Sequence, residues 1–393
     1  MKKVLLVDTN VSAAPIYRYL QSTGAEVHVV GGNPDDYLAR TAPRYVNLDY
    51  SDFDALAGLA RELDIDHLVP GCNDRAYQAC AAVNARRPCF GIDTLEATEA
   101  IINKAQFRRL ATELGIPVPR VFSPEEAAIE ETIIVKPVDA FSGRGTSVVE
   151  AGDRAGLDAA VARARSFSRT HACIVEAFLP GRLYSHSAFV SNQRVVADFV
   201  VEEHGTANRF VVDTSRVDYA FPPVMLAAIR VEVTKLAQRL GLQDGLLHTQ
   251  FLVEGDRFWF VEVTRRCPGD LYSQLIELST GFPYCEAYAR PFLGEPMTAL
   301  PAELSRRRVT RHTVSLPQGQ SLESIEFSVP LRILRWVPLA AAGDTIQPSP
   351  FSRIGLLFAE SPTQGEQDLL FDKMLGRELY AVRSLRETFH EPV

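Results

Sequence analysis

Apolar and polar positions alternate in short blocks along the first hundred residues. Apolar runs of strand length occupy 4–7, 26–30 and 67–70, and the segments that end near Leu20 and cover 54–63 have the pattern of helices. A chain that alternates strands with helices forms a parallel sheet with helices on both faces. The turn after the first run lacks the GxGxxG spacing of dinucleotide-binding folds, which disfavours that class.

A helix is predicted to begin after Asn103, a favourable N-cap residue with Gln106 three positions later. It ends at Gly115, because glycine supports the C-terminal turn and Pro117 prevents continuation. One side of this helix is apolar at helical spacing and faces a core: Phe107, Leu110, Ala111 and Leu114.

The remaining pattern is that of a mixed α/β chain. Further strands are predicted at 132–137, 147–150 and 173–176, helices at 222–240 and near 366–375, and a hairpin at 247–263. We therefore predict an α/β protein of three lobes. They are an N-terminal doubly wound parallel-sheet lobe at 1–100, a two-lobed core at 101–300 and a small C-terminal α+β lobe at 301–393.

Composition narrows the class of protein. The 393 residues are 46% hydrophobic and 23% charged, which suits two or three folded domains. A net charge of -8 disfavours a nucleic-acid-binding surface, which needs a basic stripe. The first apolar run stops at Asp8 and none reaches the length of a membrane span, so we expect a cytoplasmic protein without a membrane partner. The six scattered cysteines lack CxxC spacing, and we expect free thiols.

The first motif with chemical meaning is Lys136, which ends a predicted buried strand before a glycine-bearing loop at 141–147. Glycines let backbone N–H groups approach anionic oxygens, and a lysine fixed by a strand offers a point charge to phosphate. The alternative is a surface lysine beside a flexible hairpin, and this motif alone does not decide between the two.

The second motif is Glu176, which follows an apolar strand and leads into a bend at Pro180 and Gly181. A carboxylate there can accept a hydrogen bond from the exocyclic amine of adenine, and backbone groups of the bend can contact the same edge of the base. The alternative is a solvated carboxylate at a strand end.

The third motif is the hairpin at 247–263. Both faces of its second strand are apolar up to Glu262, which predicts a central, buried strand. A three-residue turn would set Gln250 opposite Glu262 and His248 opposite Thr264, whereas a two-residue turn would set Glu262 against Thr249. We favour the first register because it gathers a polar, oxygen-rich cluster that suits magnesium.

These motifs together resemble the ATP-grasp superfamily in their order and spacing. Five segments carry the resemblance: 103–104, 115–119, 135–137, 176–181 and 262–266. The resemblance covers the N-terminal lobe to at least residue 300. It implies an ATP-grasp fold with a pre-ATP-grasp lobe, a core that holds ATP and magnesium between two lobes, and a C-terminal lobe. The segments around His248 and 268–272 look most like the amino-acid ligase branch.

The resemblance also implies roles for matching residues, with ATP and Mg²⁺ as cofactors. The expected ATP contacts are Lys104, Lys136, Gly143, Gly145, Thr146, Ser147, Glu176, and the backbone of Phe178 and Leu179. The expected metal positions are Glu262, Gln250 and Thr264. The expected catalytic residues are Arg266, which stabilises charge on the transferring phosphoryl group, and Lys136.

Three positions depart from the family's pattern. Gln250 replaces a usual acidic residue, Thr264 replaces an asparagine, and Leu183 replaces a carboxylate that often holds the ribose hydroxyls. The number of metal ions is therefore not set by the sequence.

The leading interpretation is a carboxylate–amine ligase for small molecules, with amino acids as the favoured substrates. ATP would phosphorylate the acid, and the amine would displace phosphate from the acyl carbon. Two alternatives stay open: a bicarbonate- or biotin-type carboxylase, and a nucleotide-binding protein without turnover. His186 and His248 are candidate bases, although a lone histidine is more often structural. The sequence does not fix the substrates, the pathway or the oligomeric state, for which a homodimer is one option.

Overall fold

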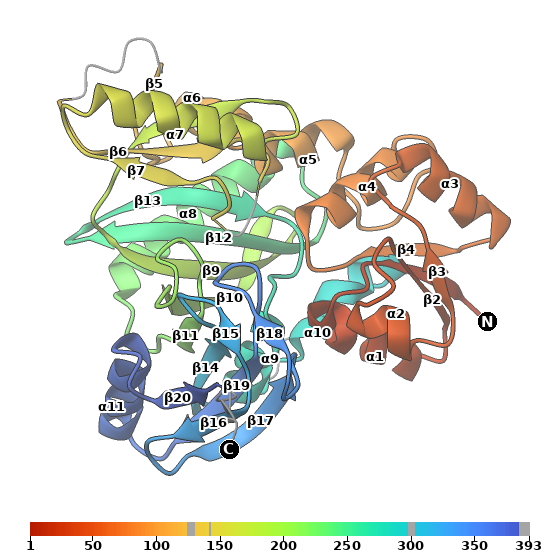
Figure 1. The fold of residues 1–393 in the computed structure, drawn as a ribbon. Coiled ribbons are helices and arrows are strands. Elements are labelled where there is room, and N and C mark those ends of the chain that lie inside the picture. The colour runs from red at the N-terminus through yellow and green to blue at the C-terminus, as the bar shows by residue number, and fades with distance from the viewer. Residues whose placement is uncertain (124–129, 141–142, 298–302, 385–393) are drawn as a thin grey trace, which may run out of the picture.

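The computed structural model describes residues 1–123, 130–140, 143–297 and 303–384. Its strands form an N-terminal parallel sheet, a small antiparallel sheet and a large antiparallel sheet, and two short ribbons lie in the C-terminal region (Figure 1). The predicted α/β architecture is confirmed. No helix in the described ranges is both long and apolar enough to cross a membrane. All six cysteines are free thiols.

The N-terminal lobe is built on a parallel sheet in the order β3-β2-β1-β4, as the alternating pattern predicts. Its strands are β1 (Lys3–Val7), β2 (Glu26–Gly31), β3 (Tyr45–Asn47) and β4 (His67–Pro70). Its helices are η1 (Val11–Ala13), α1 (Ala14–Ser22), α2 (Tyr37–Thr41), α3 (Phe53–Glu62), α4 (Asp74–Asn84) and α5 (Leu95–Ile102). The carboxyl ends of β1 and β4 lie together, and this edge faces the rest of the molecule (Figure 1).

The small antiparallel sheet has the order β5-β8-β6-β7 and its own apolar core beneath α7. Its strands are β5 (Val121–Phe122), β6 (Ile133–Pro137), β7 (Ser147–Val149) and β8 (Cys173–Ala177), and α7 is Arg154–Phe167. Helix α6 (Lys104–Glu113) leads into this lobe from the N-terminal lobe.

The large sheet has the order β13-β12-β9-β10-β11-β14-β19-β17. Its strands are β9 (Arg182–Ser191), β10 (Arg194–His204), β11 (Thr214–Val217), β12 (Gly245–Glu254), β13 (Arg257–Thr264), β14 (Arg308–Val314), β17 (Arg332–Pro338) and β19 (Gly355–Ser361). Strands beyond residue 301 thus continue the sheet of the core. The division at 100/101 and 300/301 stays a prediction.

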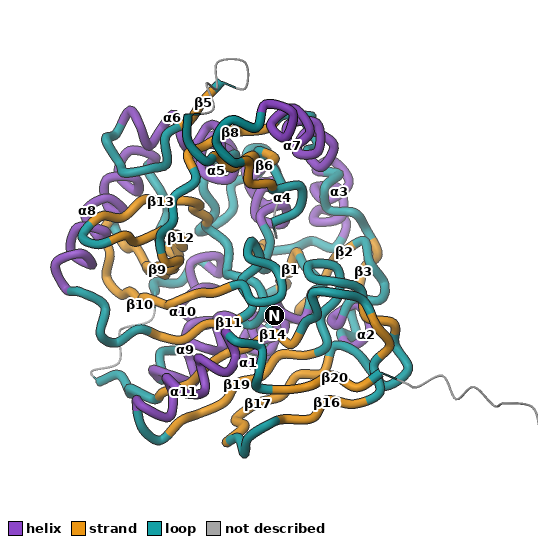
Figure 2. The backbone as a smooth tube through the Cα atoms, turned by 60° about the vertical axis from the view of Figure 1, so that its left-hand side comes forward, coloured by secondary structure: helices purple, strands orange, loops and turns teal. Residues whose placement is uncertain are grey.

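Helices lie against this sheet (Figure 2), and the two ribbons form separate small sheets in the C-terminal region. The helices are α8 (Pro223–Leu240), α9 (Tyr272–Thr280), α10 (Tyr284–Ala289), η2 (Arg290–Leu293) and α11 (Gln364–Leu375). The ribbons pair β15 (Gln320–Ser321) with β18 (Thr345–Ile346), and β16 (Ser324–Phe327) with β20 (Tyr380–Arg383). One apolar core runs from β1 through α9 and α10 to β14 and β19, so the N-terminal lobe is packed firmly against the large sheet.

The hairpin of β12 and β13 has the predicted register near Glu262, but its turn differs from the predicted one. Gln250 lies opposite Glu262 and His248 opposite Thr264, but Glu254 pairs with Arg257, so the turn has two residues and the predicted three-residue turn is wrong. A β-bulge at Val261 adds one residue to β13 and restores the register.

The expectation that β13 is a central strand is also wrong, because β13 is the first strand of the sheet. Its outer edge is covered instead. The N–H of Phe260 donates to the carbonyl of Pro117 at 2.8 Å, and Arg108 Nη2 donates to the carbonyl of Val261 at 2.7 Å. These hydrogen bonds occupy backbone groups at the outer edge of β13, which would otherwise be unpaired.

Candidate active site

Helix α6 begins at the junction of the three sheets. The side chain of Asn103 accepts the N–H groups of Ala105 and Gln106, which confirms the predicted N-cap and places Lys104 in the first turn. Lys104 Nζ donates to the carbonyl of Ala140 at 2.9 Å and lies 3.4 Å from Glu262 Oε1. This lysine therefore joins the small sheet to the hairpin of the large sheet.

One helical turn later, Arg108 reaches a second group of candidate residues. Its Nε lies 2.5 Å from one oxygen of the fully buried Glu176, and Lys136 Nζ lies 2.8 Å from the other. Burial raises the pKa of the Glu176 carboxyl, but the charges of Lys136 and Arg108 outweigh burial and hold it below its ordinary range. Glu176 is thus ionised and paired, and it fixes Lys136 at the end of β6.

The glycine loop after β6 is tightly packed where it is described. A Cβ on Gly143 would lie 2.7 Å from the Cβ of Phe210, and one on Gly145 would lie 2.8 Å from the Cβ of Phe167. Both glycines have positive φ, which other residues rarely adopt. Thr146 and Ser147 follow them at the start of β7, whereas Phe141 and Ser142 lie outside the described residues.

The bend after β8 carries the predicted adenine contacts. The N–H of Phe178 donates to the carbonyl of Thr132 at 3.0 Å, so an adenine edge would have to use other backbone groups here, such as the N–H of Leu179. The ring of Phe178 lies beneath the guanidinium of Arg209, 5.1 Å from its centre.

One face of the hairpin of β12 and β13 carries polar side chains. Gln250 and Glu262 lie side by side on it, and Gln250 Nε2 donates to Glu203 Oε2 at 2.8 Å. Since a carboxylate only accepts hydrogen bonds, the amide nitrogen must face Glu203, and the amide oxygen is turned away from it. Burial raises the pKa of Glu203, which lies on β10.

The end of β13 is tied to the N-terminal lobe. Thr264 Oγ1 donates to Asp74 Oδ1 at 2.6 Å, and Arg266 Nε donates to the same oxygen at 3.1 Å. Asp74 begins α4, where the capping side chain of Asn73 starts the helix directly after β4. The expected catalytic arginine is therefore oriented by a carboxylate at the carboxyl edge of the parallel sheet.

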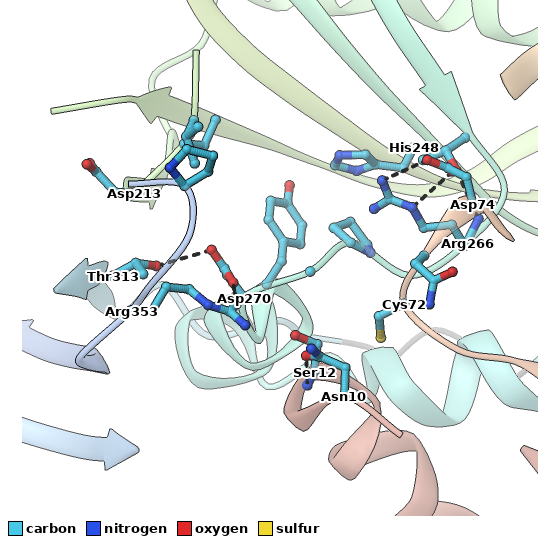
Figure 3. A pocket seen from close by; sticks show the side chains of 18 of the residues that line it. Asn10, Ser12, Cys72, Asp74, Asp213, His248, Arg266, Asp270, Thr313 and Arg353 are labelled. Atoms are coloured by element: carbon cyan, nitrogen blue, oxygen red, sulfur yellow. Dashed lines mark hydrogen bonds and ion pairs between the residues drawn. The ribbon is translucent and has the colours of Figure 1, made fainter. Parts of the chain in front are cut away.

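These residues border a cavity of about 520 Å³ between the N-terminal lobe and the large sheet (Figure 3). Arg266, Asp74 and His248 lie on one side of it, and Asp270 and Arg353 lie on the opposite side. A second cavity of about 460 Å³ lies beside Lys104 and also reaches Glu262. Glu262 therefore stands between the two cavities.

His248 and His186 are both buried in the large sheet. Burial, reinforced by the nearby charge of Arg266, lowers the pKa of His248 to about 3, and Ser187 Oγ lies 2.9 Å from its Nδ1. His186 Nε2 lies 2.8 Å from Asp198. A histidine with so low a pKa is a poor proton acceptor at neutral pH, which disfavours His248 as a general base.

The oxygen ligands present suit magnesium. The carboxylate of Glu262 and the amide oxygen of Gln250 are hard donors, whereas Thr264 has already given its hydroxyl hydrogen to Asp74. Within the described ranges no group of three His, Cys, Asp or Glu side chains is arranged to hold a metal ion. Magnesium needs only one or two protein carboxylates where nucleotide phosphates supply other oxygens.

Sequence reasoning missed Asp74, Glu203 and Arg108. Asp74 had a usable signal, because it follows a predicted parallel strand and such carboxyl ends gather functional groups. Arg108 lies four residues after Lys104, which places both on one face of α6. Glu203 had no usable signal in the sequence, because the strand that carries it was not predicted.

Comparisons with known proteins identify sequence relatives of this chain. The formate-dependent phosphoribosylglycinamide formyltransferase of Burkholderia lata is 30% identical over 321 residues, covering 75% of this chain and 76% of that protein. The same enzyme of Burkholderia cenocepacia is 29% identical over 321 residues, with the same shares of each chain. No protein-family model matches the chain.

Solved structures share the whole fold. The L-amino acid ligase from Bacillus licheniformis has a TM-score of 0.80 at 17% identity, covering 98% of this chain and 99% of that one. The phosphoribosylglycinamide synthetase from Anaerococcus prevotii has a TM-score of 0.75 at 16% identity, again covering 98% and 99%.

Proposed function

The chain belongs to the ATP-grasp superfamily as an ATP- and Mg²⁺-dependent ligase that forms carbon–nitrogen bonds, and from this premise we propose that it joins a carboxylic acid to an amine through an acyl phosphate. The γ-phosphoryl group of ATP would move to the carboxylate, with release of ADP. The amine would then displace phosphate and form the amide bond.

The observation that carries this proposal is the line of charged residues from Lys104 through Glu262 to Arg266 and Asp74. It links the junction of the lobes to the 520 Å³ cavity. Lys104 and Lys136 would hold the ATP phosphates, with the loop from Gly143 to Ser147 over them. Arg266, oriented by Asp74, would face the charge that develops on the transferring group.

Glu262 and the amide oxygen of Gln250 are the side chains that would hold magnesium, with Thr264 beside them. The bound ion would supply charge neutralisation for the phosphate oxygens. Packing of the lobes around the cavity would keep water from the acyl phosphate, which hydrolysis would otherwise destroy.

We favour an amino acid as substrate over the formate and phosphoribosylglycinamide in the names of the sequence relatives. Basic and acidic side chains line the same cavity, among them Arg353, Arg311, Asp8 and Glu203. A dipolar ligand with an ammonium and a carboxylate matches such a wall. A cytoplasmic location and a homodimer stay predictions.

Phosphate release from MgATP tests this proposal. The twenty L-amino acids, singly and in pairs, should include combinations that release phosphate above the rate with ATP alone. ADP and not AMP should be the nucleotide product. Formate with glycinamide ribonucleotide serves as the comparison pair. AMP formation would identify an adenylating enzyme, and no stimulation by any acid or amine would favour a nucleotide-binding protein without turnover.

A further inference from the structure

Glu203 lies in the wall of the 520 Å³ cavity and is only 3% exposed. Side chains alternate along β10, so its neighbour Glu202 points to the other face, where Arg216 and His204 pair with it. Glu203 has only neutral donors: Ser185 Oγ lies 2.9 Å from Oε1, and Gln250 Nε2 lies 2.8 Å from Oε2.

Some of the other carboxylates of the cavity have a cation, whereas Asp8, Asp36 and Asp213 form no ion pair with a described residue and accept hydrogen bonds from neutral backbone or side-chain donors. Asp74 pairs with Arg266, Glu262 pairs with Lys104, and Asp270 pairs with Arg353. Glu203 forms no ion pair with any described residue.

Burial raises the pKa of Glu203 and the nearby charge of Arg311 opposes that shift, but Arg311 forms its hydrogen bonds with other partners. Its Nε donates to Ser215 Oγ at 2.8 Å, and its Nη1 donates to the carbonyl of Asp270 at 3.0 Å. A buried carboxylate without a cation is unfavourable unless a ligand provides one. Because Glu203 borders a cavity, a ligand can reach it.

The surroundings of Glu203 favour an ammonium group over a metal ion. A magnesium ion requires oxygen lone pairs on several sides, but Gln250 turns its NH₂ toward Glu203 and Ser185 directs its hydroxyl hydrogen there. An ammonium group needs one or two acceptors in a favourable direction, and charge-assisted hydrogen bonds of this kind are strong.

We propose that Glu203, held in place by Ser185 and Gln250, binds the amino group of an amino-acid substrate. This inference rests on the proposed ligase activity and adds the residue that determines the substrate class. Glu203 is on β10 and Glu262 on β13, and Gln250 on β12 lies between them in the sheet order and donates to Glu203. An amino group on Glu203 would share the cavity with the reacting carboxylate, and it can belong to the acid that is activated or to the amine that attacks.

Trapping with hydroxylamine distinguishes these two sources, because hydroxylamine is an uncharged nucleophile at neutral pH and replaces the acceptor amine. The donors are matched pairs with and without the α-amino group: L-alanine and propionate, L-leucine and 4-methylpentanoate, L-phenylalanine and 3-phenylpropionate. If Glu203 binds the donor, the unmodified enzyme should form hydroxamate from the amino acid about 100-fold more efficiently than from its partner. Glu203→Gln should remove most of this preference.

If Glu203 binds the acceptor, Glu203→Gln should leave hydroxamate formation within about threefold of the unmodified enzyme. Ligation to an L-amino-acid acceptor should then fall by about 100-fold, mainly through KM. Glu203→Asp keeps the charge with a shorter reach and should retain part of the lost preference. Glu202→Gln, on the opposite face of the same strand, is the matched control and should change neither reaction.

The inference is overturned if Glu203→Gln changes amino and non-amino substrates by the same factor, or changes neither. A raised magnesium requirement with every substrate would instead assign Glu203 to the metal site and also overturn it. These outcomes leave the ligase function intact. The failure of that function has a different signature, namely no hydroxamate and no ADP from the unmodified enzyme with any acid.

Discussion

Arg266 and Asp74 form a two-point ion pair across the boundary between the large sheet and the N-terminal lobe. Nε lies 3.1 Å from Oδ1, and Nη2 lies 3.4 Å from Oδ2. Burial alone would raise the pKa of Asp74, but the charge of Arg266, the hydrogen bonds from Thr264 and Arg266 and the charge of Lys104 together hold the pKa below its ordinary range. The N-terminal lobe thus contributes directly to the orientation of the proposed catalytic arginine.

Replacement of Asp74 should therefore impair catalysis more than substrate binding. Asp74→Asn removes the charge but keeps a side chain of the same shape, and we expect kcat to fall by about 10- to 100-fold with a smaller change in KM for ATP. Steady-state kinetics measure both values. Asp54→Asn is the control, because Asp54 pairs with Arg86 on the exposed surface of the same lobe. Equal kcat in the two variants would remove Asp74 from the site.

Lys136→Ala should weaken ATP binding and also destabilise the fold. The lysine is one of two cations on the buried Glu176, so its loss leaves that carboxylate with Arg108 alone. We expect ATP affinity to fall at least about tenfold and the free energy of unfolding to fall by about 1–3 kcal/mol. Calorimetric titration and denaturant unfolding measure the two effects. Lys235→Ala removes a lysine paired with Glu232 on α8, and its result should match the unmodified protein in both assays.

Magnesium dependence should separate Glu262 from Gln250. Glu262→Gln leaves no carboxylate at the predicted metal position of the hairpin, whereas Gln250→Ala removes only a neutral amide, so we expect the first to cost far more activity. Titration of magnesium against ATP turnover compares the two variants. If Glu262→Gln matches the unmodified enzyme at every magnesium concentration, the metal site does not lie here.

The free energy of unfolding should decrease as the pH falls below about 6.5, partly because of His312. Burial lowers the pKa of this imidazole to about 4, with nearby arginines in the same direction and Asp213 opposing them, while Thr214 and Tyr380 hold its two nitrogens. The unfolded chain binds the proton near about pH 6.5. The neutral His312 therefore contributes fully to the free energy of unfolding above that pH, and this contribution is lost as the pH falls toward 4.

His312→Gln removes this titration, so the pH dependence of unfolding should be shallower in the variant. At pH 5 the histidine should account for a loss on the order of 1–2 kcal/mol relative to pH 7.5. Denaturant unfolding at several pH values measures the difference between the two proteins. Parallel curves would show that His312 is not neutral in the fold.

Local sequence signals predicted much of the fold and part of the site. The cap at Asn103, the parallel strands and the pairing of Gln250 with Glu262 all depend on neighbouring residues, and all are confirmed. The two-residue turn and the β-bulge that together produce this pairing were not predicted from the sequence. In the fold, Arg108 Nη2 donates to the carbonyl of Val261, the extra residue of the bulge.

The contacts between elements far apart in the chain could not be predicted from the sequence. Asp74 meets Arg266 from 192 residues away, and Glu203 meets Gln250 from a strand that was not predicted. Such pairs depend on how sheets pack, and residue spacing along the chain carries no record of it. The roles proposed for Lys104, Glu176 and the glycine loop stay predictions for the same reason.

The central claim is that a carboxylate is activated as an acyl phosphate, and oxygen-18 transfer tests it most directly. An acid labelled in both carboxylate oxygens, taken from the pairs that release phosphate, should be ligated in the presence of MgATP. One labelled oxygen should appear in each released phosphate, because the acyl C–O bond breaks when the amine attacks. Mass spectrometry of the phosphate reads the result. Unlabelled phosphate, or label in AMP, would contradict the account.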